Sequence, residues 1–152
     1  MLIECFFKIE NKALSKGFIL IEIVKHDHVR FFSLSQAQEL LPLVYRLTEE
    51  SAREVKYLMA CVEALPDKKS SRALEIQDQI NALIEKWQNK LERLGAKPKG
   101  LWLADFDNGA GYFCWKFPET LISHKHGYQD GFTGRILISS NEESNENCPS
   151  TN

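Results

Sequence analysis

The chain has 152 residues, 43% of them hydrophobic, so it can bury one core but not two. Charged residues make up 26% of the sequence and give a formal net charge of −2, which argues against binding of nucleic acid. The four cysteines are scattered without a CxxC pair, which excludes a zinc ribbon or a disulfide scaffold and predicts reduced thiols in a cytoplasmic protein.

The first 29 residues contain two apolar runs, at positions 1–9 and 18–24, joined by a segment with the composition of a turn. Their aromatic and β-branched residues predict a β-hairpin that extends the main domain at its N-terminus. Glu4 and Glu22 interrupt these runs, and neither run approaches the roughly 20 apolar residues of a membrane-spanning helix. We therefore expect neither a signal peptide nor a membrane as a partner.

A long amphipathic helix is predicted from Ser33 onward. Ser33 and Gln36 have the spacing of a capping box, in which each side chain bonds to the backbone N–H of the other residue. Apolar residues then recur in steps of three and four across positions 37–65, which is the pattern of one helix face. Pro42 falls inside this pattern, and we expect it to kink the helix without ending it.

A second helix is predicted from Ser71 to Leu94, with Gly95 placed to adopt the left-handed conformation that ends helices. The short connection between the two helices predicts an antiparallel hairpin. The pattern leaves open whether its apolar stripes are buried against each other, against a sheet or against a second copy of the chain. A homodimer or another protein partner held through the helical hairpin is therefore an alternative to a purely structural role.

After Gly100 the hydrophobic period drops to two, which predicts a small antiparallel sheet. Its first two strands form a hairpin around a turn rich in asparagine and glycine. The predicted strands are residues 101–106, 112–117, 121–126 and 134–138.

These elements predict one α+β domain over residues 1–138, in which a long antiparallel helical hairpin packs with a small antiparallel β-sheet. Residues 139–152 contain no apolar residue other than Cys148, so this tail is predicted to be disordered. Cys148 is accordingly not expected in a site.

The sequence from Arg30 to Leu137 resembles the family known as domain of unknown function 2203. The resemblance rests on the order and spacing of Phe32-Ser33-Leu34, Leu40-Leu41-Pro42, Asp105-Phe106, Cys114-Trp115, Glu119, His126 and Gly131-Phe132-Thr133-Gly134-Arg135. Lys125 stands where the family usually has a tryptophan. The resemblance implies no activity, but it selects Asp105, Cys114, Trp115, Glu119, His126 and Arg135 as site residues, and not His26, His28 or His124.

Cys114, Glu119 and His126 supply a thiolate, a carboxylate and an imidazole, which together are the ligand set of a zinc or iron site. We predict that these three residues bind a divalent metal ion such as zinc, with Asp105 on the neighbouring strand able to join them. We also predict that Glu119, His126 and Arg135 share one pocket, because a single turn separates the two motifs that contain them.

A small anionic ligand is the other ligand class that these residues suggest. Arg135 and backbone N–H groups near Gly134 can hold an anion. The residues that we predict to contact it are Asp105, Trp115, Glu119 and Arg135.

Two further interpretations remain open at the level of sequence. Cys114 activated by His126 is the arrangement of a cysteine-dependent hydrolase, and a metal-dependent hydrolase is equally compatible with these residues. The sequence has no phosphate-binding glycine loop and no HExxH helix to support an enzyme. Alternatively, Cys114 is an inert core residue, and Glu119 and Arg135 simply pair with each other or with Asp130.

Overall fold

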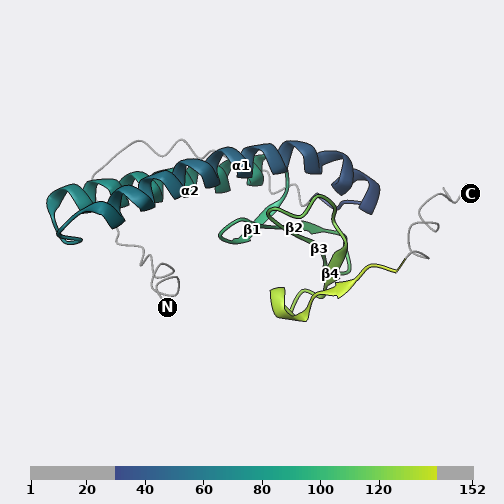
Figure 1. Ribbon diagram of the computed structural model, residues 1–152. Coiled ribbons are helices and arrows are strands. Elements are labelled where there is room, and N and C mark those ends of the chain that lie inside the picture. The colour runs from purple at the N-terminus through teal and green to yellow at the C-terminus, as the bar shows by residue number, and fades with distance from the viewer. Residues whose placement is uncertain (1–29, 140–152) are drawn as a thin grey trace, which may run out of the picture.

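The computed structural model describes residues 30–139, whose arrangement is shown in Figure 1. The predicted N-terminal β-hairpin and all but the first residue of the predicted disordered tail lie outside the described residues. Two long helices run side by side next to a small antiparallel sheet, which confirms the predicted α+β fold.

Helix α1 spans Leu34–Ala64 and begins with the predicted capping box. The Ser33 hydroxyl accepts a hydrogen bond from the Gln36 N–H, and the Gln36 side chain accepts one from the Ser33 N–H, both at 3.1 Å. The helix continues through Pro42, which confirms that proline does not end it. Leu41 and Val44 on either side of Pro42 are buried in the same core.

Helix α2 spans Ser71–Arg93 and lies antiparallel to α1, as predicted. The Ser70 side chain caps its first turn. Gly95 follows with a φ of +86°, the left-handed conformation expected there. In the connection between the helices, the ammonium of Lys68 donates hydrogen bonds to carbonyl groups at the end of α1, those of Val62, Glu63 and Leu65.

The sheet of the described part has five antiparallel strands that follow one another in space as in sequence. They are β1 Lys97–Gly100, β2 Leu103–Asp107, β3 Tyr112–Lys116, β4 His124–His126 and β5 Ile136–Leu137, and the short helix η2 Phe132–Gly134 precedes β5. Strands β2 and β3 form the predicted hairpin. Strand β1 was not predicted, because Lys-Pro-Lys-Gly lacks the alternation of a strand. Strands β4 and β5 are shorter than predicted.

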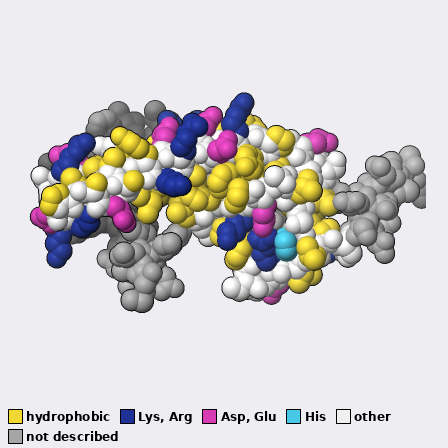
Figure 2. Space-filling model, in the orientation of Figure 1, with side chains coloured by type: hydrophobic (Ala, Val, Ile, Leu, Met, Phe, Trp, Pro, Cys, Tyr) yellow, Lys and Arg dark blue, Asp and Glu magenta, His cyan; other side chains and the backbone are white. Residues whose placement is uncertain are grey.

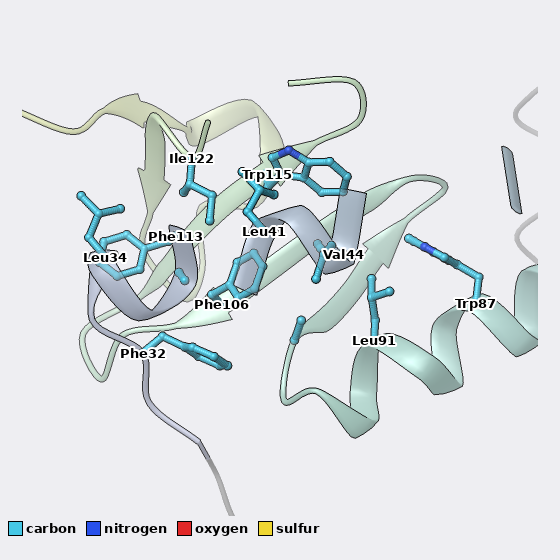
Figure 3. Packing of buried hydrophobic residues seen from close by; sticks show 13 residues of the cluster. Phe32, Leu34, Leu41, Val44, Trp87, Leu91, Phe106, Phe113, Trp115 and Ile122 are labelled. Atoms are coloured by element: carbon cyan, nitrogen blue, oxygen red, sulfur yellow. The ribbon is translucent and has the colours of Figure 1, made fainter. Parts of the chain in front are cut away.

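One face of the sheet packs against the helices and forms the main core (Figure 3). Phe106 of β2 and Trp115 of β3 are fully buried there against residues of both helices, among them Val44, Trp87 and Leu91. A second, smaller cluster lies between the helices toward their connection and contains Val55, Ile76 and Ile80. Neither described helix is long and apolar enough to cross a membrane.

The opposite face of the sheet, called the outer face below, carries the polar residues. Side chains alternate along a strand, so Asp105 and Cys114 point away from the core that their neighbours Phe106 and Trp115 enter. Asp105 pairs with Cys114, and Cys114 pairs with His124, which places these three residues in one row across the outer face. The fold therefore concentrates polar chemistry on the side of the sheet that the helices do not cover.

Candidate functional site

Three potential metal ligands from three strands converge on the outer face. They are Asp105 of β2, Cys114 of β3 and His126 of β4, and their ligand atoms all lie within 4.8 Å of one another. All three residues are buried, although the outer face is not covered by the helices. We call these three residues the Asp105 triad.

His126 is held in a defined orientation within the Asp105 triad. Its Nδ1 lies 2.8 Å from the carbonyl oxygen of Gly127, which can only accept a hydrogen bond, so Nδ1 carries a proton. Its Nε2 lies 3.2 Å from a carboxylate oxygen of Asp105, and the two side chains are only 4% and 3% exposed. Nε2 is therefore either protonated toward the carboxylate or free to bind a cation between the two groups.

Cys114 is a protonated thiol at neutral pH in the metal-free protein. Burial, together with the negative charge of Asp105 and a hydrogen bond to it, raises the pKa of the Cys114 thiol to about 12. An activated cysteine nucleophile requires the opposite shift, toward a lower pKa. This environment thus disfavours nucleophilic catalysis by Cys114, whereas a bound metal ion would itself remove the proton.

A second polar group, called the Arg135 cluster, lies next to the triad on the outer face. The Nη2 atom of Arg135 is 2.5 Å from a Glu119 carboxylate oxygen and 2.7 Å from Nδ1 of His124. The other oxygen of Glu119 accepts the backbone N–H of Lys116 at 3.0 Å. The guanidinium of Arg135 also lies over the ring of Phe132, 4.7 Å from its centre.

A third group fixes the turn that follows β4. Asp107 accepts hydrogen bonds from the Tyr128 hydroxyl at 2.8 Å and the Lys97 ammonium at 2.9 Å. Burial opposes ionisation of Asp107, but these donors and the Gly109 N–H outweigh it and lower its pKa, while the bond to Asp107 raises the pKa of Lys97. Since Tyr128 belongs to the same turn as Gly127, this group helps to hold the carbonyl that orients His126.

The structure divides the residues predicted from the sequence between two adjacent clusters. Cys114 and His126 lie together with Asp105, whereas Glu119 pairs with Arg135. The clusters are neighbours because His124, which contacts Arg135, pairs with Cys114 across β3 and β4. The charges of Glu119 and Arg135 accordingly act on the Cys114 thiol.

Trp115 is not brought to either cluster. Its ring is fully buried in the core on the opposite face of the sheet, and its Nε1 donates a hydrogen bond to the backbone carbonyl of Glu119 at 2.6 Å. Through this bond Trp115 helps to fix the segment that carries Glu119, although its ring touches neither cluster.

Sequence reasoning set His124 aside because it lies outside the family pattern, and it did not name Asp107 or Tyr128 as site residues. His124 precedes His126 by two residues, so a strand at this place puts both imidazoles on one face, and that spacing was a usable signal. The roles of Asp107 and Tyr128 depend on the path of the chain after β4. No short-range pattern predicts that path.

Comparison with protein families gives one match. The family described as "Uncharacterized conserved protein (DUF2203)" matches residues 30–138. This chain belongs to the DUF2203 family. The DUF2203 region includes both helices, all five strands and every residue of the two clusters. No match is found among curated proteins or among solved structures.

Proposed function

We propose that this DUF2203 protein binds one divalent metal ion of the zinc class through Asp105, Cys114 and His126. The observation that carries the proposal is the convergence of three ligand atoms from three strands within 4.8 Å, in a buried place. Thiolate, imidazole and carboxylate are ligands that zinc accepts. The proposal uses Asp105 in the place that the sequence suggested for Glu119, because Glu119 is paired with Arg135.

The distances suit a tetrahedral ion. With ligand bonds near 2.0 Å, the nitrogen and oxygen ligands of a tetrahedral site lie about 3.3 Å apart, close to the 3.2 Å between His126 Nε2 and Asp105 Oδ2. Sulfur and nitrogen ligands lie about 3.5 Å apart. Cys114 Sγ lies within 4.8 Å of a ligand atom of each of the other two residues, so the sulfur must move closer for all three to bind one ion.

Charge and orientation also favour a cation. The Cys114 thiolate and the Asp105 carboxylate together neutralise a divalent ion, which reduces the cost of burying each charge. The hydrogen bond from His126 Nδ1 to the Gly127 carbonyl directs Nε2 toward the site, as backbone carbonyls do for histidine ligands of metals. Three protein ligands leave a fourth position for water or another small ligand.

The direct experiment is a metal analysis of protein purified without an affinity tag, followed by titration of the metal-free protein with zinc and cobalt. We expect one ion per chain and, with cobalt, a sulfur-to-metal charge-transfer absorption. Cys114→Ser should abolish this absorption, and His126→Ala should abolish tight binding. Cys61→Ser is the matched control, because Cys61 is the other free thiol of the described part and lies on α1.

Two outcomes would contradict the metal site. One is unchanged metal binding by His126→Ala or Cys114→Ser. The other is a parent protein that binds no metal while His126→Ala unfolds several degrees lower, which would identify His126 as a packing residue.

We also propose a cytoplasmic location for the protein. Free thiols at Cys61 and Cys114 support this location, because thiols stay reduced there.

Self-association through the helical hairpin is a second candidate function, and one surface favours it. A groove of about 740 Å³ between the helices is lined by apolar groups, including Tyr57 and Leu83, with Arg53, Glu54 and Lys86 beside them. Charges of both signs suit contact between two copies of one surface. In the metal experiment, Tyr57→Glu should leave metal binding intact but abolish any dimer seen by sedimentation, which separates the two functions.

A further inference from the structure

The guanidinium of Arg135 has hydrogen-bonding capacity that the described residues do not use. Both of its hydrogen bonds, to Glu119 and His124, come from the same atom, Nη2. A guanidinium has five N–H groups in a planar fork. No buried side-chain donor of residues 30–139 lacks a partner, so the unused N–H groups of Arg135 reach the surface.

An exposed lysine lies near the same aromatic ring as this guanidinium. The ammonium of Lys116 lies 5.4 Å from the centre of the Phe132 ring, and the guanidinium of Arg135 lies 4.7 Å from the same point. Lys116 is exposed and forms no ion pair within the described part. Within the described part, Glu119 pairs with Arg135 alone. Figure 2 shows basic side chains gathered with a histidine and an acidic side chain on the sheet part of the visible face.

His124 helps to hold the Arg135 guanidinium in place. Its Nδ1 lies 2.7 Å from Nη2 of Arg135, which can only donate, and so Nδ1 accepts. The ring proton is then on Nε2. The Ser123 hydroxyl, 3.0 Å from the same Nδ1, is consistent with this tautomer.

We propose that Arg135, oriented by His124, and Lys116 form a binding site for a small oxyanion, namely the phosphate or carboxylate group of a ligand. The Arg135 fork binds two oxygens of such a group, and Lys116 supplies a point charge. In the ligand-free protein the carboxylate of Glu119 accepts a hydrogen bond from Nη2 of Arg135 and so takes the place of one ligand oxygen. Glu119 is 31% exposed while Arg135 is only 11% exposed, so the carboxylate can swing aside while the cation stays in place.

This site is distinct from the Asp105 triad and does not require a metal ion. It makes Glu119 an internal competitor of the ligand, and this has an unusual consequence. Removing the charge of Glu119 should strengthen anion binding, although it removes an ion pair from the protein. A purely structural ion pair predicts no such gain.

The test is calorimetric titration of metal-free protein, dialysed free of the chelator used to remove metal, with inorganic phosphate and separately with acetate. The two titrations distinguish phosphate from carboxylate ligands. We expect Arg135→Gln to weaken binding of the preferred anion about tenfold or more. We expect Glu119→Gln to strengthen it several-fold. Arg72→Gln on α2 is the control, because Arg72 is also an arginine paired with a glutamate, and it should bind as the parent does.

Equal binding by Arg135→Gln and the parent would overturn the proposal, as would a Glu119→Gln variant that binds no better than the parent. If Arg135→Gln does not fold, Lys116→Gln decides, because Lys116 is exposed and its loss leaves the core intact. Unchanged binding by Lys116→Gln would then count against the site. Because no metal is present, failure here is separable from failure of the metal proposal.

Discussion

Cys114 shows how one environment can suppress one kind of chemistry and favour another. The thiol sits beside a carboxylate in a buried place, which raises its pKa to about 12 and removes thiolate at neutral pH. The same carboxylate and the nearby imidazole of His126 are what a divalent cation requires. The residue is thus inert as a free thiol and suited to be a metal ligand.

This assignment predicts that metal binding releases protons. At pH 7 the Cys114 thiol is protonated, because its pKa of about 12 lies far above that pH, and a metal ligand must be a thiolate. Titration with zinc in two buffers of different ionisation enthalpy should show release of at least one proton per ion. Apparent affinity should rise with pH for the same reason. If zinc binds without proton release, Cys114 is not a ligand.

At the scale of elements, local signals explain what could be predicted. The ends of α1 and α2 depend on serine caps and a left-handed glycine, all of which act within a few residues, and their sequence predictions hold to within one or two residues. Strand β1 has no such signal. Its Lys-Pro-Lys-Gly sequence pairs with β2 because the chain returns there after α2, and a tertiary path overrides weak strand propensity.

The candidate site also has one part that local signals predict and another part that depends on long-range pairing. Asp105 and Cys114 face each other because of the turn between β2 and β3, which the sequence specifies well. The partner of His126 depends on how β4 adds to β3, and the partner of Arg135 depends on the return of the chain through η2. These are long-range pairings, which is why the sequence could nominate the residues but not divide them into two clusters.

Pro42 provides a test of the first helix. Proline inside a helix costs roughly 3 kcal/mol, partly offset because it restricts the unfolded chain by about 1 kcal/mol. Pro42 is exposed, so Pro42→Ala creates no cavity, and we expect a higher melting temperature. Pro66→Ala is the control. Pro66 lies in the connection after α1, so its replacement cannot restore a helical hydrogen bond. A lower melting temperature for Pro42→Ala would mean that a bend at Pro42 is needed to fit α1 against the sheet.

At the scale of the whole molecule, the helical hairpin reaches beyond the sheet, and its two halves have different support. The half near the sheet belongs to the main core, whereas the other half is held by the smaller cluster of Val55, Ile76 and Ile80. Trp102 packs against both clusters and lies edge to face with Trp87, with ring centres 5.0 Å apart. It is the only described residue other than glycine with a positive φ, 62°.

Trp102 should therefore couple the far half of the hairpin to the rest of the fold. Trp102→Ala removes the contacts to both clusters, and because the ring is half-buried we expect a loss of about 2–3 kcal/mol in the free energy of unfolding. In native-state hydrogen exchange, amides on either side of the helix connection should exchange much faster, while those of β2 and β3 change less. Leu101→Ala, an exposed neighbour, should change neither set. Equal acceleration at all protected amides would instead show that the hairpin and the sheet unfold as one cooperative unit, with Trp102 contributing only to its total stability.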